Sequence, residues 1–265
     1  MALPKPEIDD LEEQRISLVE AYIDTFQLDL VGCKRIERSV QKLFGMPEFE
    51  CAARITFGLL QSTKRNYGEA VHHLNRAQLL VDSEMVRMAS VTAALQCGAV
   101  RDAASLLAAA ELTSDPRHLR QLMSKAMHAG MYILANKCLE ELAKLKADAS
   151  NPAAGFLSKY SPDIYAAAEL VKAHGLCDSD IVERVAVATD VVARRAPDHP
   201  FVVYGFSVTP ETGIHYEFPL RMPVDELVQL DWDISEALVE VFDDPHSELI
   251  SFSTRPFSES VRRIA

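Results

Sequence analysis

Apolar side chains recur at helical spacing from residue 7 to about residue 146, and this period limits the fold more than any other feature of the chain. In the first predicted helix the apolar residues between Ile8 and Phe26 fall on one stripe, with acidic side chains elsewhere. Turn residues such as Gly98 and Gly130 separate the later helices, which are similar in length. Because helices joined by short turns lie antiparallel to their neighbours, the pattern predicts a stack of helical hairpins.

The predicted stack has an internal repeat. Ala70, Ala103 and Ala135 follow one another at steps of 33 and 32 residues, and each precedes a leucine by four residues. Small side chains let adjacent helices approach closely, and the leucine fills the space beside them. Three units at a near-constant period can bury a continuous core, so we expect these three alanines to be buried between helices.

With these residues, the segment 51–146 resembles the tetratricopeptide repeat, a helix-turn-helix unit of about 34 residues. The residues that carry the resemblance in the first unit are Gly58, Tyr67, Ala70, Leu74 and Ala77. The later units depart from the pattern, because Val91 and Met123 stand where the glycine would be and no proline closes a unit. An unrelated array of helical hairpins is the alternative.

The resemblance implies a concave groove, lined by the first helix of each hairpin, that holds a segment of a partner protein. Carried over position by position, it gives these partner-binding residues: Ile55, Leu59, Met85, Met88, Arg117, Arg120 and Met127. Tetratricopeptide repeats that clamp the C-terminal carboxylate of a peptide have Lys and Asn where this chain has Ile55 and Leu59. We therefore expect the groove to hold an apolar or amphipathic segment instead. Methionine suits such a soft surface, although the alternative is that the methionines belong to the core.

Residues 147–160 predict a linker between a helical-hairpin repeat domain, residues 1–146, and a second domain, residues 161–265. The second domain would begin with two helices, and from Pro200 the hydrophobic period becomes two, which indicates strands. The expected elements are helices at about 162–174 and 179–196, strands at 201–208 and 214–218, a helix at about 223–242 and a strand at about 248–253. We expect this last helix to pack on the hairpin and the last strand to pair with it. The predicted fold is mostly α: an antiparallel helical-hairpin, tetratricopeptide-like stack followed by a small C-terminal α+β unit of ββαβ order.

The charge of the chain limits its partners. The sequence has 39 Asp and Glu against 27 Lys and Arg, a formal net charge of −12, and residues 151–265 alone carry 19 acidic and 9 basic side chains. Such an acidic surface repels phosphate backbones and anionic lipid, so we expect neither nucleic acid nor membrane as a partner. The sequence shows no signal peptide and no run of 18 apolar residues, which predicts a cytoplasmic protein.

Specific catalytic motifs are absent from the sequence, which has no Gly-rich phosphate loop, nucleophile elbow or zinc-protease motif. The five cysteines are widely spaced without a C-x-x-C pair, and we interpret those in the repeat as buried thiols. His72 and His73 are adjacent on a helix and therefore diverge, so they cannot hold one metal together. His215 and Glu217 share a strand face and could act as an acid/base pair, but the polar side of a hairpin explains them better. We expect no catalytic residue, cofactor or metal.

These observations favour an interaction scaffold, an adaptor or chaperone-like protein that holds a partner segment in the helical groove. Two alternatives stay open. One is an enzyme whose site lies between the helical body and the C-terminal hairpin and uses His215, Glu217 or Tyr204. The other is a self-assembling homo-oligomer in which the hairpin or the last strand pairs between copies.

Overall fold

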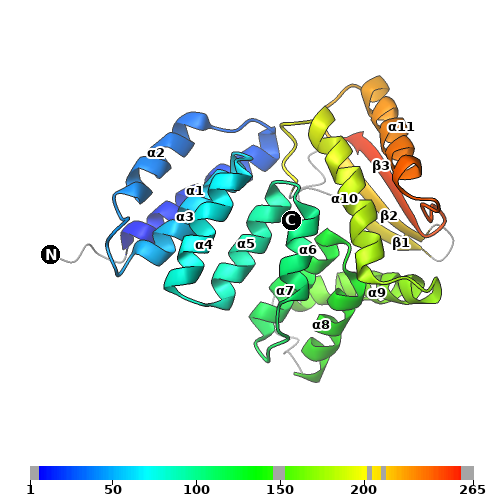
Figure 1. Cartoon of the computed structure of the whole chain (residues 1–265), viewed down its shortest axis with the longest axis horizontal. Coiled ribbons are helices and arrows are strands. Elements are labelled where there is room, and N and C mark those ends of the chain that lie inside the picture. Colours follow the sequence, from blue (N-terminus) through cyan, green and yellow to red (C-terminus); the bar gives the residue numbers. More distant parts are fainter. Residues whose placement is uncertain (1–5, 146–152, 202–204, 210–212, 258–265) are drawn as a thin grey trace. The chain divides into compact units, whose positions relative to one another are not determined.

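A computed structural model describes residues 6–145, 153–201, 205–209 and 213–257 (Figure 1). Over these residues the chain forms eleven helices and one three-stranded sheet near its C-terminal end. The predicted fold class is confirmed: the protein is mostly α, with a small α+β unit after the helices.

Backbone contacts divide the chain into two compact units. The first contains residues 1–97 and 198–202, and the second contains residues 98–197 and 203–265. The segment 147–160, expected as a linker between domains, falls inside the second unit. Its residues from 153 onward are helical, because helix α9 runs over Ala153–Ala173.

The first unit consists of five helices: α1 (Pro6–Thr25), α2 (Leu30–Gln41), α3 (Glu50–Thr63), α4 (Tyr67–Leu80) and α5 (Glu84–Gln96). Residues 198–201 join this unit late in the chain. The Tyr22 hydroxyl donates to the carbonyl of Asp198 at 2.7 Å, and Arg65 donates to that of His199 at 3.0 Å. Two hydrogen bonds thus fix this returning segment against α1 and the turn between α3 and α4.

Helices α3 and α4 approach closely at Gly58. A Cβ atom placed there would lie 2.8 Å from Cγ of Leu74 and 3.2 Å from the carbonyl oxygen of Ala70. Any larger residue would force these helices apart, which explains the glycine of the first repeat unit. Ala70, Ala103 and Ala135 are all fully buried, so the predicted burial of these alanines is confirmed.

The second unit begins with α6 (Val100–Ala108), α7 (Pro116–Ala129), α8 (Tyr132–Lys144), α9 and α10 (Asp178–Arg195). Gly130 ends α7 with φ of 84°, a left-handed conformation that suits glycine. Asp178, at the start of α10, accepts hydrogen bonds from the N–H groups of Ile133 and Leu134 at 2.8 and 3.0 Å. These donors belong to the first turn of α8, so a side chain of one helix caps another.

Helix α9 starts earlier than the sequence analysis expects. Ser161 and Pro162 were expected to begin the helix at about residue 162, but α9 begins at Ala153 and contains Pro162 in its interior. Proline fits helical φ, although it removes one hydrogen bond and its ring crowds the carbonyl four residues earlier, which costs about 3 kcal/mol. The preceding residues include the good helix formers Ala, Leu and Lys, which favour the helix on that side. The boundary signal at Pro162 was therefore overridden.

The sheet has the order β1-β2-β3, formed by Gly205–Thr209, Gly213–Leu220 and Ile250–Pro256. Strands β1 and β2 are antiparallel, while β2 and β3 are parallel and connected through α11 (Val224–Val241). The expected pairing of the last strand with the hairpin is thus confirmed, and α11 packs against β3. The expected strand at 201–208 begins later, at Gly205, and residues 202–204 lie outside the described residues.

One face of β2 is apolar and buried. The side chains of Ile214, Tyr216, Phe218 and Leu220 are at most 4% exposed. The Tyr216 hydroxyl donates to the carbonyl of Met127 on α7 at 2.6 Å, so this face packs on the helices of the same unit. Burial raises the pKa of Tyr216. In the described part of the chain, every helix is too short or too polar to cross a membrane.

Candidate functional site

The seven predicted groove residues differ in exposure. Four of them are buried, with 9% of Ile55, 8% of Leu59, 4% of Met88 and 5% of Met127 exposed. Met85 and Arg117 are exposed, and Arg120 is half-buried. Ile55 and Leu59 pack in a core cluster with residues of α4 and α5. A partner could reach Met85, Arg117 and Arg120 directly, but the four buried side chains only if helices moved apart.

Met85 belongs to a larger exposed apolar surface in the first unit. The end of α4 and the start of α5 expose Leu79, Leu80, Val81 and Met85, and Leu79 and Met85 are 79% and 63% exposed. We call these four residues the α4–α5 patch. It lies at the turn between two helices and not along a helix face.

Helix α11 exposes a line of apolar side chains in the second unit. Its inner face carries Leu227, Leu230 and Ile234, which are at most 3% exposed. Its outer face carries Val224, Val228, Trp232 and Val239, which are 62%, 52%, 69% and 67% exposed. These four positions fall within one arc of the helix, and we call them the α11 stripe. Trp232 is the single tryptophan of the chain.

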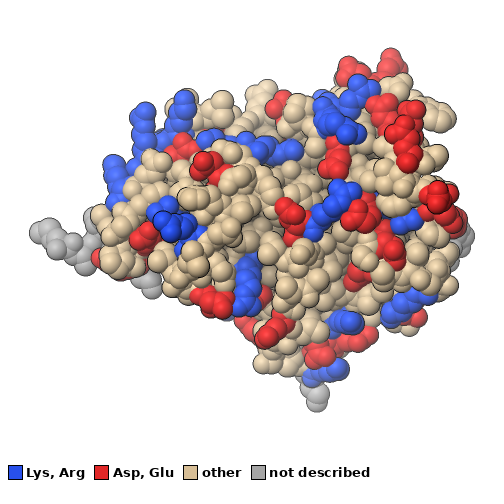
Figure 2. Space-filling model, viewed as in Figure 1, with Lys and Arg blue, Asp and Glu red and all other residues tan. Residues whose placement is uncertain are grey.

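Carboxylates line one side of the α11 stripe. At 100° per residue, Asp225, Glu236 and Glu240 lie in the arc of the helix next to the stripe, and all three are exposed. None of the three pairs with a cationic side chain among the described residues. Figure 2 shows acidic side chains gathered over this region of the molecule.

The two aspartates beside Trp232 have structural partners. Asp231 accepts from the N–H group of Thr254 at 2.6 Å, which ties α11 to β3. Asp233 accepts from the guanidinium of Arg195 at 2.7 Å, which ties α11 to α10. This D-x-D pair therefore anchors the helix to its neighbours.

His215 and Glu217 lie on the polar face of the sheet, as the strand alternation predicts, but each contacts another partner. The two ring nitrogens of His215 lie 2.9 Å from Oγ of Ser251 and 3.1 Å from Oγ of Ser253. Glu217 forms an ion pair of 2.7 Å with Arg255. The histidine and the glutamate therefore hold β2 to β3 instead of facing each other. Tyr204 lies outside the described residues.

Three cysteine thiols are poorly reactive, although the burial expected of Cys51, Cys97 and Cys138 is complete only for Cys138, because Cys51 and Cys97 are half-buried. Cys33 and Cys138 are fully buried, and burial raises their pKa values to about 11 and about 12. Burial also raises the pKa of Cys97 to about 11. A thiol with such a pKa stays protonated near neutral pH, so none of the three is a ready nucleophile. Cys177 is exposed, and its Sγ atom lies 2.9 Å from Oδ2 of Asp180.

Burial strongly lowers the pKa values of a histidine and a lysine. Burial, with Arg54 and His72 nearby, lowers the pKa of His73 to about 4. Its ring packs against Phe44 and Phe57, and Arg54 lies 3.1 Å from Nδ1, so the neutral ring accepts a hydrogen bond there. Burial lowers the pKa of Lys125, on α7, to about 8. The burial of Lys125 has no local pattern in the sequence that could have identified it.

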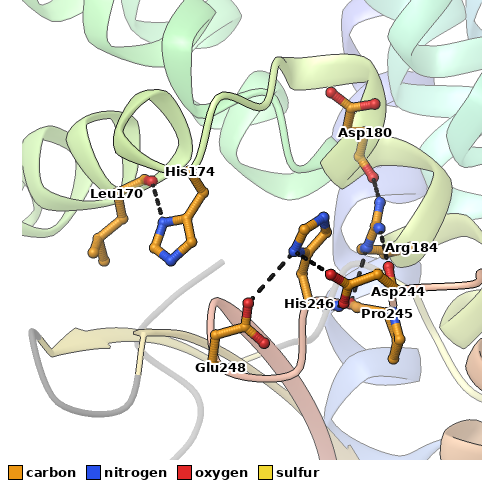
Figure 3. A network of polar contacts seen from close by, with 8 residues as sticks. All are labelled: Leu170, His174, Asp180, Arg184, Asp244, Pro245, His246 and Glu248. Carbon is orange, nitrogen blue, oxygen red and sulfur yellow. Dashed lines mark hydrogen bonds and ion pairs between the residues drawn. The ribbon is translucent and has the colours of Figure 1, made fainter.

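A polar cluster in the α11–β3 loop escaped the sequence analysis. Nδ1 of His246 lies 3.4 Å from Oδ2 of Asp244 and 3.4 Å from Oε1 of Glu248 (Figure 3). Potential metal-ligand atoms of the three residues all lie within 4.8 Å of one another. In the sequence these residues occupy alternate positions, D-x-H-x-E. This spacing alone does not predict a cluster, because the three side chains meet only if the backbone turns.

The adjoining loop backbone is fixed by Arg184 of α10. Its guanidinium donates to the carbonyls of Asp244 at 2.7 Å, Pro245 at 3.0 Å and Asp180 at 2.7 Å. Arg184 is 6% exposed, and its guanidinium lies 4.4 Å from the centre of the Phe242 ring. A buried arginine thus holds the loop in one conformation.

Comparison of the chain with protein-family models, with curated proteins and with solved structures gives no match.

Proposed function

We propose that the protein is an interaction adaptor and that a partner segment docks on the α11 stripe. The observation that carries this proposal is the line of four exposed apolar side chains, Val224, Val228, Trp232 and Val239, on one helix face. The inner face of α11 already supplies the contacts that hold the helix in the second unit. The stripe therefore contributes nothing to that packing and leaves apolar surface in contact with water.

The composition of the stripe suits protein recognition. Tryptophan is among the residues most enriched at the energetic centres of protein interfaces, and Trp232 is 69% exposed at the middle of the stripe. Apolar residues at steps of four present a straight ridge, which fits the apolar face of a helix or an extended segment. Burial of such a ridge supplies about 25 cal/mol for each Å² removed from water.

The charge beside the stripe identifies the chemistry of the partner. Asp225, Glu236 and Glu240 present three exposed carboxylates along one side. A partner with Lys or Arg beside its apolar residues would pair with them, so we propose a basic amphipathic segment. A second copy of this chain would bring another row of carboxylates, which disfavours self-assembly through this face.

The predicted groove contributes in part to this proposal. Within the first unit, Met85 of the predicted set extends the α4–α5 patch with Leu79. This patch offers a second exposed apolar contact, as expected of a scaffold with more than one binding surface. The buried members, such as Leu59, are assigned to the core and not to the primary contact.

The fluorescence of Trp232 provides the test, since the chain has no other tryptophan. A helical peptide of leucine and lysine should shift the emission of Trp232, and a peptide with glutamate in place of lysine should bind much more weakly. Val228→Glu and Val239→Glu should each weaken binding about tenfold or more, since they put charge into the contact. Leu30→Glu is the matched control, because Leu30 is 59% exposed, between Val228 and Val239, and lies on α2 outside both the stripe and the α4–α5 patch.

Two results would contradict the proposal that a partner segment docks on the α11 stripe. One is unchanged binding of the basic peptide to both stripe variants. The other is self-association of the protein, seen by light scattering, that Val228→Glu abolishes, because the stripe would then be covered by a second copy. Replacing Asp225, Glu236 and Glu240 by their amides should reduce the effect of salt on peptide affinity.

A further inference from the structure

The donor set of the α11–β3 loop is chemically mixed. His246 supplies an imidazole nitrogen, and Asp244 and Glu248 supply carboxylate oxygens. Three protein ligands of these types, completed by water, are typical of open zinc sites. Calcium and magnesium prefer oxygen ligands alone, so the imidazole favours a transition metal.

The distances within the cluster fit a metal shell better than direct hydrogen bonds. Charge-assisted hydrogen bonds are usually about 2.7–2.9 Å long. Here Nδ1 of His246 is 3.4 Å from each of the two carboxylates. Ligand bonds of about 2.1 Å in a tetrahedral shell separate neighbouring donor atoms by roughly 3.4 Å. The imidazole nitrogen thus stands from each carboxylate at the separation that a tetrahedral ion would require, and all three ligand atoms lie within 4.8 Å of one another.

Buried contacts hold the loop on both sides of the cluster. Before His246, the guanidinium of Arg184 binds the carbonyls of Asp244 and Pro245. After it, the carbonyl of His246 accepts from the N–H groups of Leu249 and Ile250, each at 2.9 Å. Leu249 is fully buried, so the end of the loop is fixed in the core. Ligand side chains on an anchored backbone lose little freedom when they bind an ion.

The carboxylates are accessible and not neutralised by another close ion pair. The side chains of Asp244 and Glu248 are 67% and 61% exposed, and among the described residues no Lys or Arg side chain forms an ion pair with either of them. Arg184 brings one positive charge nearby, but its N–H groups donate to main-chain carbonyls and not to the two carboxylates of the cluster (Figure 3). The local charge therefore favours a cation.

We infer that Asp244, His246 and Glu248 bind one divalent transition-metal ion of the zinc class, with water completing its shell. The ion would join the start, middle and end of a five-residue loop segment between α11 and β3. Its binding would add to the stability of the folded second unit, because the unfolded chain does not hold the three ligands together.

The test is a titration of the full chain with Zn²⁺ in competition with a chromophoric chelator. The wild type should bind one ion, and Glu248→Gln and His246→Asn should each weaken that binding about tenfold or more. Asparagine is chosen at position 246 because the backbone there has φ of 52°, which asparagine tolerates well. Asp243→Asn is the matched control, because it removes an exposed neighbouring carboxylate outside the cluster.

A second measurement needs no variant. Mn²⁺, which accepts imidazole and carboxylate ligands, should broaden the amide NMR signals of residue 244 and of residues 246–248 before those of other regions. The inference is overturned if the wild type shows no saturable Zn²⁺ binding, or if both ligand variants keep its affinity. It is also overturned if Co²⁺ gives a thiolate charge-transfer band that Cys177→Ser removes, because the ion would then bind the exposed thiol.

Discussion

Arg184, on α10, donates a 2.7 Å hydrogen bond to the main-chain carbonyl of Asp244, 60 residues further along the chain. The same guanidinium binds Pro245 and Asp180, so one side chain connects a helix to the loop that follows α11. Burial lowers the pKa of Arg184, while the carboxylates of Asp180 and Asp244 raise it. Three partners on one planar fork make this arginine hard to replace.

Arg184→Met should therefore lower the free energy of unfolding by about 1–3 kcal/mol, because carbonyls lose their donor in a buried place. Arg184→Lys should also destabilise, since one ammonium group cannot reach three carbonyls from the positions of the fork. Urea unfolding measures both effects. Arg194→Met, a change at an exposed position of α10, should stay within about 0.5 kcal/mol of the wild type. Equal losses of unfolding free energy in Arg184→Met and Arg194→Met would contradict a special role for the hydrogen bonds of the Arg184 guanidinium.

Gly58 and Gly68 give a matched pair for the packing of α3 on α4. Gly58→Ala should destabilise by about 1–3 kcal/mol, because the new Cβ would lie 2.8 Å from Cγ of Leu74. A Cβ at Gly68 would meet nothing within 4 Å, so Gly68→Ala should stabilise helix α4 by about 0.5–1 kcal/mol. Thermal or urea unfolding of the two variants checks both signs. Stabilisation by both substitutions would contradict the close approach at Gly58.

His73 should make the first unit sensitive to acid. Its pKa in the folded state is about 4, below the ordinary histidine value of about 6.5. A lowered histidine pKa means that the folded state resists protonation, so its stabilising contribution is complete above about pH 6.5 and is lost as pH falls through about 4. The difference corresponds to about 3 kcal/mol.

His73→Gln should flatten this loss between pH 6.5 and 4, although it removes ring packing against Phe44 and Phe57. The measurement is the free energy of unfolding at a series of pH values. Arg54→Met offers an independent check by NMR, because Arg54 is one cause of the lowered value and its loss should raise the pKa of His73. An equally steep acid loss in His73→Gln would mean that another group controls it.

Local patterns in the sequence were sufficient for most elements of this fold. The period of 3.6 residues located the helices of the repeat, and the small residues Ala70, Ala103 and Ala135 identified positions where helices meet. The switch to a period of two located the sheet. These features depend on residues within one or two turns of each other, so a single sequence carries them.

Features that depend on distant residues were not predictable. Asp178 caps α8 across 45 residues, and only the folded backbone brings its carboxylate to Ile133. The exposure of Trp232 follows from which face of α11 packs on the sheet, although the buried stripe at Leu227 and Leu230 was visible. The cluster around His246 needs a turn of the loop that no local pattern specifies.

The parallel pairing of β2 with β3 supports a last prediction, on the C-terminal end. Residues of β2 pair with β3 from Ile214 with Ile250 to Leu220 with Pro256, so removal of β3 would open one full edge of the central strand. It would also remove Leu249 and Ile250, which are at most 2% exposed, from the apolar core. An unpaired edge beside uncovered apolar surface promotes association between copies. Deletion of residues 245–265 should therefore cause aggregation, measured by light scattering. Deletion of residues 258–265 alone keeps every pair of this ladder and should scatter like the full chain. If the longer deletion stays monomeric and unfolds at the same urea concentration as the full chain, β3 is not required to complete the sheet.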